Sequence, residues 1–128
     1  MSVIVSISED PNGIWMLNNR AYRWFAHEVM KRMASDPDAS KAVEMSEIFH
    51  ALLLDRIVTD DYELAIRLRD SLVETAGLIR SGELDICASA MAYPEKNGEE
   101  NLRSLFSELE EMLLGWAPRR ISGEGMSL

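Results

Sequence analysis

The stretch Asp60–Gly82, DDYELAIRLRDSLVETAGLIRSG, is predicted to decide the fold, because its apolar residues recur every three or four positions along its length. Asp60 and Glu63 have the spacing of a capping box with Asp in place of Ser or Thr, so the helix is expected to begin near Asp60. It continues to about Ser81, and Gly82 suits the left-handed position that follows a helix.

This predicted helix carries two apolar strips. The main strip consists of Leu64, Leu68, Leu72, Ala76 and Ile79. The second strip, roughly opposite, consists of Tyr62, Ile66 and Val73. A helix that is apolar on two sides is either central in its fold or part of a contact between copies.

Two more helices are expected before it. The first runs roughly from Leu17 to Met33 and ends where Pro37 disfavours helix at the residue before it. Its core face is Tyr22, Phe25, Ala26, Val29 and Met33. The second runs roughly from Ser40 to Ile57. Its predicted buried stripe is Ala42, Met45, Ile48, Phe49, Leu52 and Leu53.

A last helix is predicted from about Glu99 to Trp116, with Asn97 as its N-cap and Pro118 as its stop. Its apolar stripe is Leu102, Leu105, Leu109, Met112 and Trp116, widened by Phe106 and Leu113. That width is typical of a helix packed on a core rather than of a bare coiled-coil seam.

The β content is expected to be small. Ser2–Ser8 is β-branched and apolar and is followed by the turn residues of Glu9–Gly13, which predicts one short strand. Glu83–Tyr93 fits both a strand and a helix, and its alanines favour helix. The fold class is therefore predicted as mainly α, a compact bundle of four to five amphipathic helices over 1–117 with a flexible tail over 118–128. The alternative is an α+β fold in which segment 83–93 pairs with the strand.

Charge and cysteine content narrow the classes of function. Lys and Arg number 13 against 22 Asp and Glu, which gives a net charge of −9. This charge disfavours nucleic acid and anionic membranes and suits a basic protein partner. Cys87 is the single cysteine, and no apolar stretch approaches the roughly 20 residues of a membrane span. Residence in the reducing cytoplasm is expected.

Motifs for catalysis or cofactor binding are not found, so neither an enzyme nor a cofactor is predicted. The nearest approach to a metal motif is Glu44-x-x-Glu47-x-x-His50, and the weak alternative site is Glu28, Glu47 and His50 completed in a homodimer. Helical geometry argues against it, since Glu47 would point about 170° away from the predicted buried stripe. A solvated polar face is the preferred interpretation.

The most informative predicted surface lies on the first helix. Its residues are Arg20, Arg23, Trp24, His27 and Lys31. They fall within an arc of about 100°, opposite the core face. An outward Trp flanked by Arg is typical of a protein interface. The alternative is that Trp24 packs under the N-terminal segment or the loop near Pro94.

Three hypotheses for function follow. The first is a protein-interaction module of the inhibitor or immunity, antitoxin or chaperone-adaptor type, whose partner is basic. The second is a homo-oligomeric structural or regulatory subunit, which binds another copy of itself. The third is a metal-binding helical bundle that uses Glu47 and His50.

Overall fold

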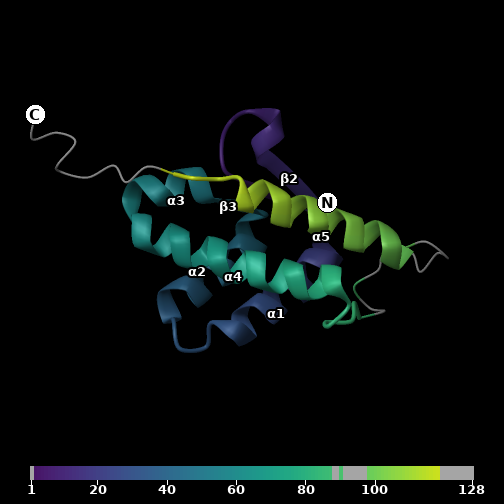
Figure 1. The fold of residues 1–128 in the computed structure, drawn as a ribbon. Coiled ribbons are helices and arrows are strands. Elements are labelled where there is room, and N and C mark those ends of the chain that lie inside the picture. Colours follow the sequence, from purple (N-terminus) through teal and green to yellow (C-terminus); the bar gives the residue numbers. More distant parts are fainter. Residues whose placement is uncertain (1, 88–89, 91–97, 119–128) are drawn as a thin grey trace, which may run out of the picture.

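A small sheet and a set of helices pack around one apolar core. The structure is a computed structural model that describes residues 2–87, 90 and 98–118. It is mainly helical with a short β part, as predicted (Figure 1). The elements are β1 (Ser2–Ser6), the 3-10 helix η1 (Pro11–Gly13), β2 (Ile14–Asn18), α1 (Asn19–Arg32), α2 (Pro37–Phe49), β3 (Ala51–Leu53), α3 (Leu54–Asp60), α4 (Tyr62–Ser81) and α5 (Gly98–Leu114).

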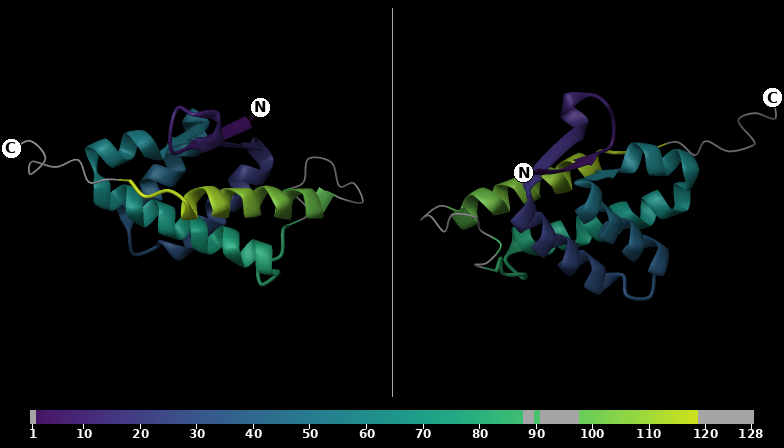
Figure 2. Two further views of the ribbon diagram at one scale, coloured as in Figure 1. Left: turned by 45° about the horizontal axis from the view of Figure 1, so that its top comes forward. Right: turned by 180° about the vertical axis from the view of Figure 1, so that it is seen from behind.

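Helix α4 is central, which is one of the two outcomes that its double apolar face predicted. It contacts α1, α2, α3 and α5, and α5 runs alongside it for most of its length (Figures 1 and 2). Leu68, Leu72, Ala76 and Ile79 of its main strip are fully buried. The second strip is half-buried.

The ends of α4 follow from local chemistry. Its N-cap is Asp61, one residue later than expected, and the Asp61 carboxylate accepts a hydrogen bond from the backbone N–H of Leu64 at 3.1 Å. Gly82 follows the helix with a φ of 84°, as predicted, because glycine adopts this left-handed conformation without steric cost.

The core centres on an aromatic cluster that joins the sheet, α1 and α5. Phe106 of α5 lies 4.8 Å from Phe25, 5.7 Å from Trp15 and 6.3 Å from Trp24, measured between ring centroids. The indole N–H of Trp15 also donates to the backbone carbonyl of Leu105 at 2.7 Å. This cluster holds β2 against α5.

The first predicted helix begins too early. The chain forms a β-hairpin before it, and Leu17 belongs to β2, which pairs antiparallel with β1. Asp10 caps η1 in the connection by accepting from the backbone N–H of Asn12 at 3.0 Å. Helix α1 starts after Asn18, whose side chain accepts from the N–H of Ala21 at 2.9 Å.

The second predicted helix is interrupted. Helix α2 ends at Phe49, His50 takes a left-handed conformation with a φ of 58°, and the chain then forms β3. The predicted stripe is therefore wrong at Ile48 and Phe49, which are 61% and 67% exposed, whereas Leu52 is buried as predicted. The residues of α2 that are buried are Ala39, Val43 and Ser46.

The sheet has the order β2-β1-β3, with β1 antiparallel to β2 and parallel to β3. Both edges of β1 are thus occupied, and the alternative in which segment 83–93 pairs with it is wrong. The described residues of that segment, 83–87 and 90, form neither a strand nor an α-helix.

The predictions for Asn97 and for the tail beyond Pro118 fall outside the described residues. Within residues 2–87, 90 and 98–118, no helix combines the length and apolar character needed to cross a membrane.

We expect Phe106→Ala to lower the free energy of unfolding by about 3–5 kcal/mol, because it opens a cavity at the centre of the aromatic cluster. Chemical denaturation measures this change. Leu114→Ala on the same helix is the control, since Leu114 is exposed and its truncation should change stability by less than about 0.5 kcal/mol. Equal losses for the two variants would contradict the central role of Phe106.

Candidate functional site

The five residues of the predicted first-helix patch lie on α1, but they do not form one outward surface. The side chains of Arg20, Arg23, His27 and Lys31 are exposed. Trp24 is half-buried, and its ring lies edge-on to Phe106 of α5. The prediction that Trp24 points outward is wrong, because α5 packs against that side of α1.

Two of the basic residues of the patch face a carboxylate of α2. Glu47 Oε1 lies 3.9 Å from Arg23 Nε and 3.6 Å from His27 Nε2. The Glu47 side chain is only 20% exposed, so it does not belong to a solvated polar face as predicted. The reason is the rotation of α2: Val43 and Ser46 face the core, which turns Glu47 toward α1 and Phe49 toward solvent.

A buried chain of hydrogen bonds lies beside Glu47. Tyr22 Oη and Ser46 Oγ are 2.6 Å apart, and the Ser46 hydroxyl donates to the backbone carbonyl of Val43. Because a serine hydroxyl has one proton, the Tyr22 hydroxyl is the donor to Ser46. Burial raises the pKa of Tyr22 to about 12, and the negative charge of Glu47 adds to this shift.

A small polar hollow opens next to this chain and is lined by Asn19, Tyr22, Arg23, Glu47 and His50 together with Val3. Its volume of about 30 Å³ suits a water molecule, which needs at least about 10–15 Å³, and is too small for an organic ligand. Asn19 Oδ1 and His50 Nδ1 are buried without a hydrogen-bond partner among the described residues. The hollow brings Glu47 and His50 together, as the metal alternative required.

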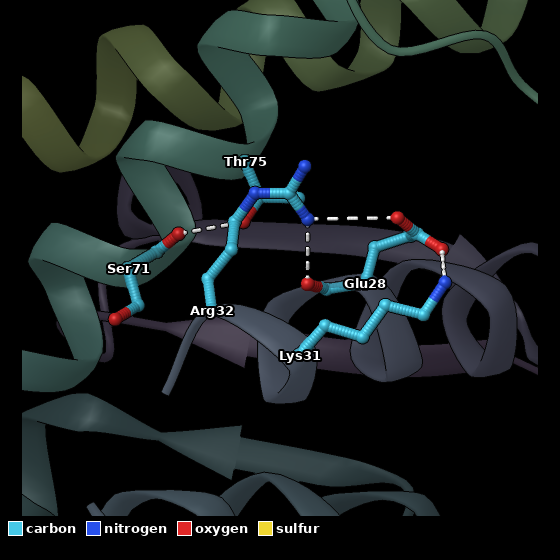
Figure 3. Close-up of polar contacts among 5 residues, drawn as sticks. All are labelled: Glu28, Lys31, Arg32, Ser71 and Thr75. Atoms are coloured by element: carbon cyan, nitrogen blue, oxygen red, sulfur yellow. Dashed lines mark hydrogen bonds and ion pairs between the residues drawn. The ribbon is translucent and has the colours of Figure 1, made fainter. Parts of the chain in front are cut away.

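Glu28, the third member of that alternative, lies elsewhere on α1. It pairs with Lys31 Nζ at 2.7 Å and with Arg32 Nη1 at 3.5 Å, and the hydrogen bond from Lys31 is the main cause of its lowered pKa (Figure 3). In the part of the chain that the structure describes, no three His, Cys, Asp or Glu side chains are grouped to hold a metal ion. The site of Glu28, Glu47 and His50 is therefore not assembled within one copy.

Sequence reasoning missed the outer face of the sheet. Residues paired across neighbouring strands point to the same face. On the inner face, Val3, Val5, Trp15, Leu17 and Leu52 are buried in the core. The outer face has one row of Met16, Ile4 and Ala51, a second row of Ile14, Ser6 and Leu53, and a polar pair, Asn18 and Ser2, beyond the first row.

Five of the six residues in the two three-residue rows are apolar, although the solvent face of a sheet normally carries polar residues. Met16 and Ile14 are 53% and 38% exposed. Ser6 is the exception, and its hydroxyl donates to Asp55 at 3.0 Å. The signal that could have found this face is the apolar run of Ile14–Leu17, once it is assigned to a strand.

The outer face is hollowed at one end. A depression of about 300 Å³ lies between the hairpin and α3. Its apolar lining is Ile4, Ile14 and Leu53, and its charged lining is Glu9, Asp55 and Arg56. The surface therefore has an apolar centre and a charged rim in which carboxylates outnumber the one guanidinium.

Comparison with protein-family models, with curated proteins and with solved structures finds no match for this chain.

We expect Ser46→Ala to cost about 1–3 kcal/mol of stability, because it leaves the buried Tyr22 hydroxyl without an acceptor. Tyr22→Phe should cost less, and the double variant should cost less than the sum of the two single changes. Urea unfolding of the four proteins gives this coupling, with the exposed Ser104→Ala as the control. Additive losses would show that the two hydroxyls do not act as a pair.

The pKa of Tyr22 also predicts a dependence of stability on alkaline pH. Because the folded pKa is about 12 and the ordinary value is 10.0, unfolding releases a proton between these pH values. The free energy of unfolding should fall by up to about 1.4 kcal/mol per pH unit between about pH 10 and 12. Tyr22→Phe should lack this component. Parallel stability curves for the two proteins across this range would contradict the assignment.

Proposed function

We propose that this protein is a non-catalytic interaction module that binds a partner protein on the outer face of its sheet. The main observation behind the proposal is that apolar residues on neighbouring strands, Met16, Ile4, Ile14 and Leu53, project from that face away from the core. Exposed apolar groups that are contiguous over several strands mark interaction sites in proteins that are otherwise polar outside.

The energetic argument rests on Met16 and Ile14. Each keeps more than a third of its surface exposed, so covering this face removes apolar area from water. That removal contributes roughly 25 cal/mol per Å² before the costs of association. The depression beside Ile14 and Leu53 is the feature of this face that suits an apolar anchor residue from the partner.

The charge of the surroundings favours a basic partner. Glu9 and Asp55 line the rim of the depression, and the whole chain carries a net charge of −9. Such a field attracts a cationic protein and raises its association rate, and salt weakens this effect. Among the three hypotheses from the sequence, this supports the inhibitor, antitoxin or adaptor type over a metal-binding bundle.

The first-helix residues are a weaker candidate for the same role. Arg23 and His27 lie near Glu47, and Lys31 is paired with Glu28, so their charges are largely balanced within the chain. Arg20 is the cation of the predicted patch that has no ion-pair partner within 4.0 Å among the described residues, and Trp24 is half-buried against the core.

The test is a photoreactive amino acid placed at Met16 in cells that express the protein, with the same amino acid at Ala34 as the matched control. Ala34 is exposed in the turn between α1 and α2, which lies on the opposite side of the molecule from the hairpin (Figures 1 and 2). We expect position 16, and not position 34, to cross-link a basic protein that mass spectrometry identifies.

The identified partner then gives a quantitative prediction. Met16→Lys should weaken its binding about tenfold or more, whereas Ala34→Lys, which makes a closely similar change in net charge, should not. Calorimetry at two salt concentrations should show weaker binding at the higher one. A folded Met16→Lys variant that binds as tightly as the wild type would overturn the proposal.

A further inference from the structure

A second apolar surface lies along the free edge of β3, between α2 and α3. It is a groove of about 380 Å³ whose lining is mainly apolar. The lining includes Met45 and Phe49 of α2, Leu53 of β3 and Ile57 of α3. Arg56 and Asp60 of α3 also line it. The sequence pattern predicts that Met45, Phe49 and Leu53 belong to one continuous buried stripe, and so it does not indicate a groove.

The backbone along this groove is available for pairing. The N–H of Ile4 donates to the carbonyl of His50 at 3.1 Å, and Ile4 is in register with Ala51. Since successive peptide groups of a strand point to opposite sides, the N–H and C=O of Ala51 face away from β1. An exposed strand edge of this kind is a template for another strand.

Phe49 is the most exposed large apolar side chain in the described part of the chain, at 67%. It stands at the wall of the groove, at the end of α2. A lone aromatic ring in water next to an apolar hollow indicates a surface that is covered in the working assembly.

The charges of the groove are complementary to themselves. Arg56 and Asp60 are exposed, lie about one turn apart on α3, and have no ion-pair partner within 4.0 Å among the described residues. A basic partner would meet Arg56 and an acidic partner would meet Asp60. A twofold axis that passes midway between the two side chains would instead place Arg56 of each copy opposite Asp60 of the other.

We propose that this chain forms a symmetric dimer through the groove between α2 and α3. The two β3 strands pair antiparallel, as a twofold axis perpendicular to the sheet edge requires, and Phe49 of each copy enters the groove of the other. The groove shares Leu53 and Arg56 with the depression on the outer sheet face, but Phe49 and Asp60 line only the groove. Variants at Asp60 and at Met16 therefore test the dimer and the binding of a basic partner separately.

The experiment measures the mass of the full chain in solution by sedimentation equilibrium as a function of concentration. We expect a dimer for the wild type. Arg56→Asp and Asp60→Arg each place like charges across the axis, and each should weaken dimerisation about tenfold or more. Arg20→Asp, which makes the same change in net charge as Arg56→Asp on an exposed site of α1, should leave the dimer intact.

The decisive sample is an equimolar mixture of Arg56→Asp and Asp60→Arg. One copy then carries two acids in its groove and the other carries two bases, so a heterodimer should form that neither variant forms alone. A circular dichroism melt of each variant checks that it is folded. A monomeric wild type, single variants that dimerise like the wild type, or a mixture that stays monomeric would each overturn the proposal.

The test of the dimer and the test of partner binding can be distinguished by two variants. Met16→Lys should remain dimeric, and Asp60→Arg, whose residue lines the groove but not the depression, should still cross-link the basic partner through position 16. Loss of both properties in either variant would show that the groove and the outer sheet face are a single surface, which would also overturn the dimer as proposed.

Discussion

The structure depends on the pairing of β1 on both of its edges. This five-residue strand is bonded to β2, its neighbour in sequence, and to β3, which follows it by more than forty residues. The parallel pairing with β3 forces the chain to leave helical geometry at His50, whose positive φ is uncommon for a residue with a side chain. The break turns the end of α2 outward and exposes Phe49, so the groove beside β3 is a direct consequence of the sheet.

The same pairing explains which parts of the fold the sequence predicts. Helices α4 and α5 can be predicted from the sequence, because their apolar repeat extends over many residues and each helix packs against the core along its length. The strand β3 is not recognisable, because three apolar residues inside a helical pattern carry no local signal, and the partner that makes them a strand is far away in sequence. The strand at Ile14–Leu17 is not predicted for a related reason, since a short apolar run fits a helix as well as a strand.

The site predictions fail where a distant element decides the direction of a side chain. Helical periodicity alone predicts an outward Trp24 on α1, but α5 supplies a second apolar neighbour on that side through Phe106. A stripe of α2 with Ile48 and Phe49 inward predicts a solvated Glu47. With Val43 and Ser46 inward instead, Glu47 turns toward Arg23 and His27. In both cases a contact with a distant element, which helical periodicity does not encode, decides the direction of the side chain.

The two proposed surfaces share a boundary, and this constrains how they work together. Leu53 and Arg56 line both the depression on the outer sheet face and the groove beside β3. Pairing of two β3 strands would join two three-stranded sheets into one of six strands, with both outer faces on the same side because a twofold axis perpendicular to the sheet preserves its faces. A basic partner would then meet two apolar faces at a fixed spacing, and a partner with two matching sites would gain affinity from the dimer without any new contact.

Arg56, opposite Asp60 of the second copy, would be neutralised in the dimer, which leaves Glu9 and Asp55 as the net charge beside each apolar face. On this argument dimerisation makes the outer sheet face more acidic and so strengthens its complementarity to a basic partner.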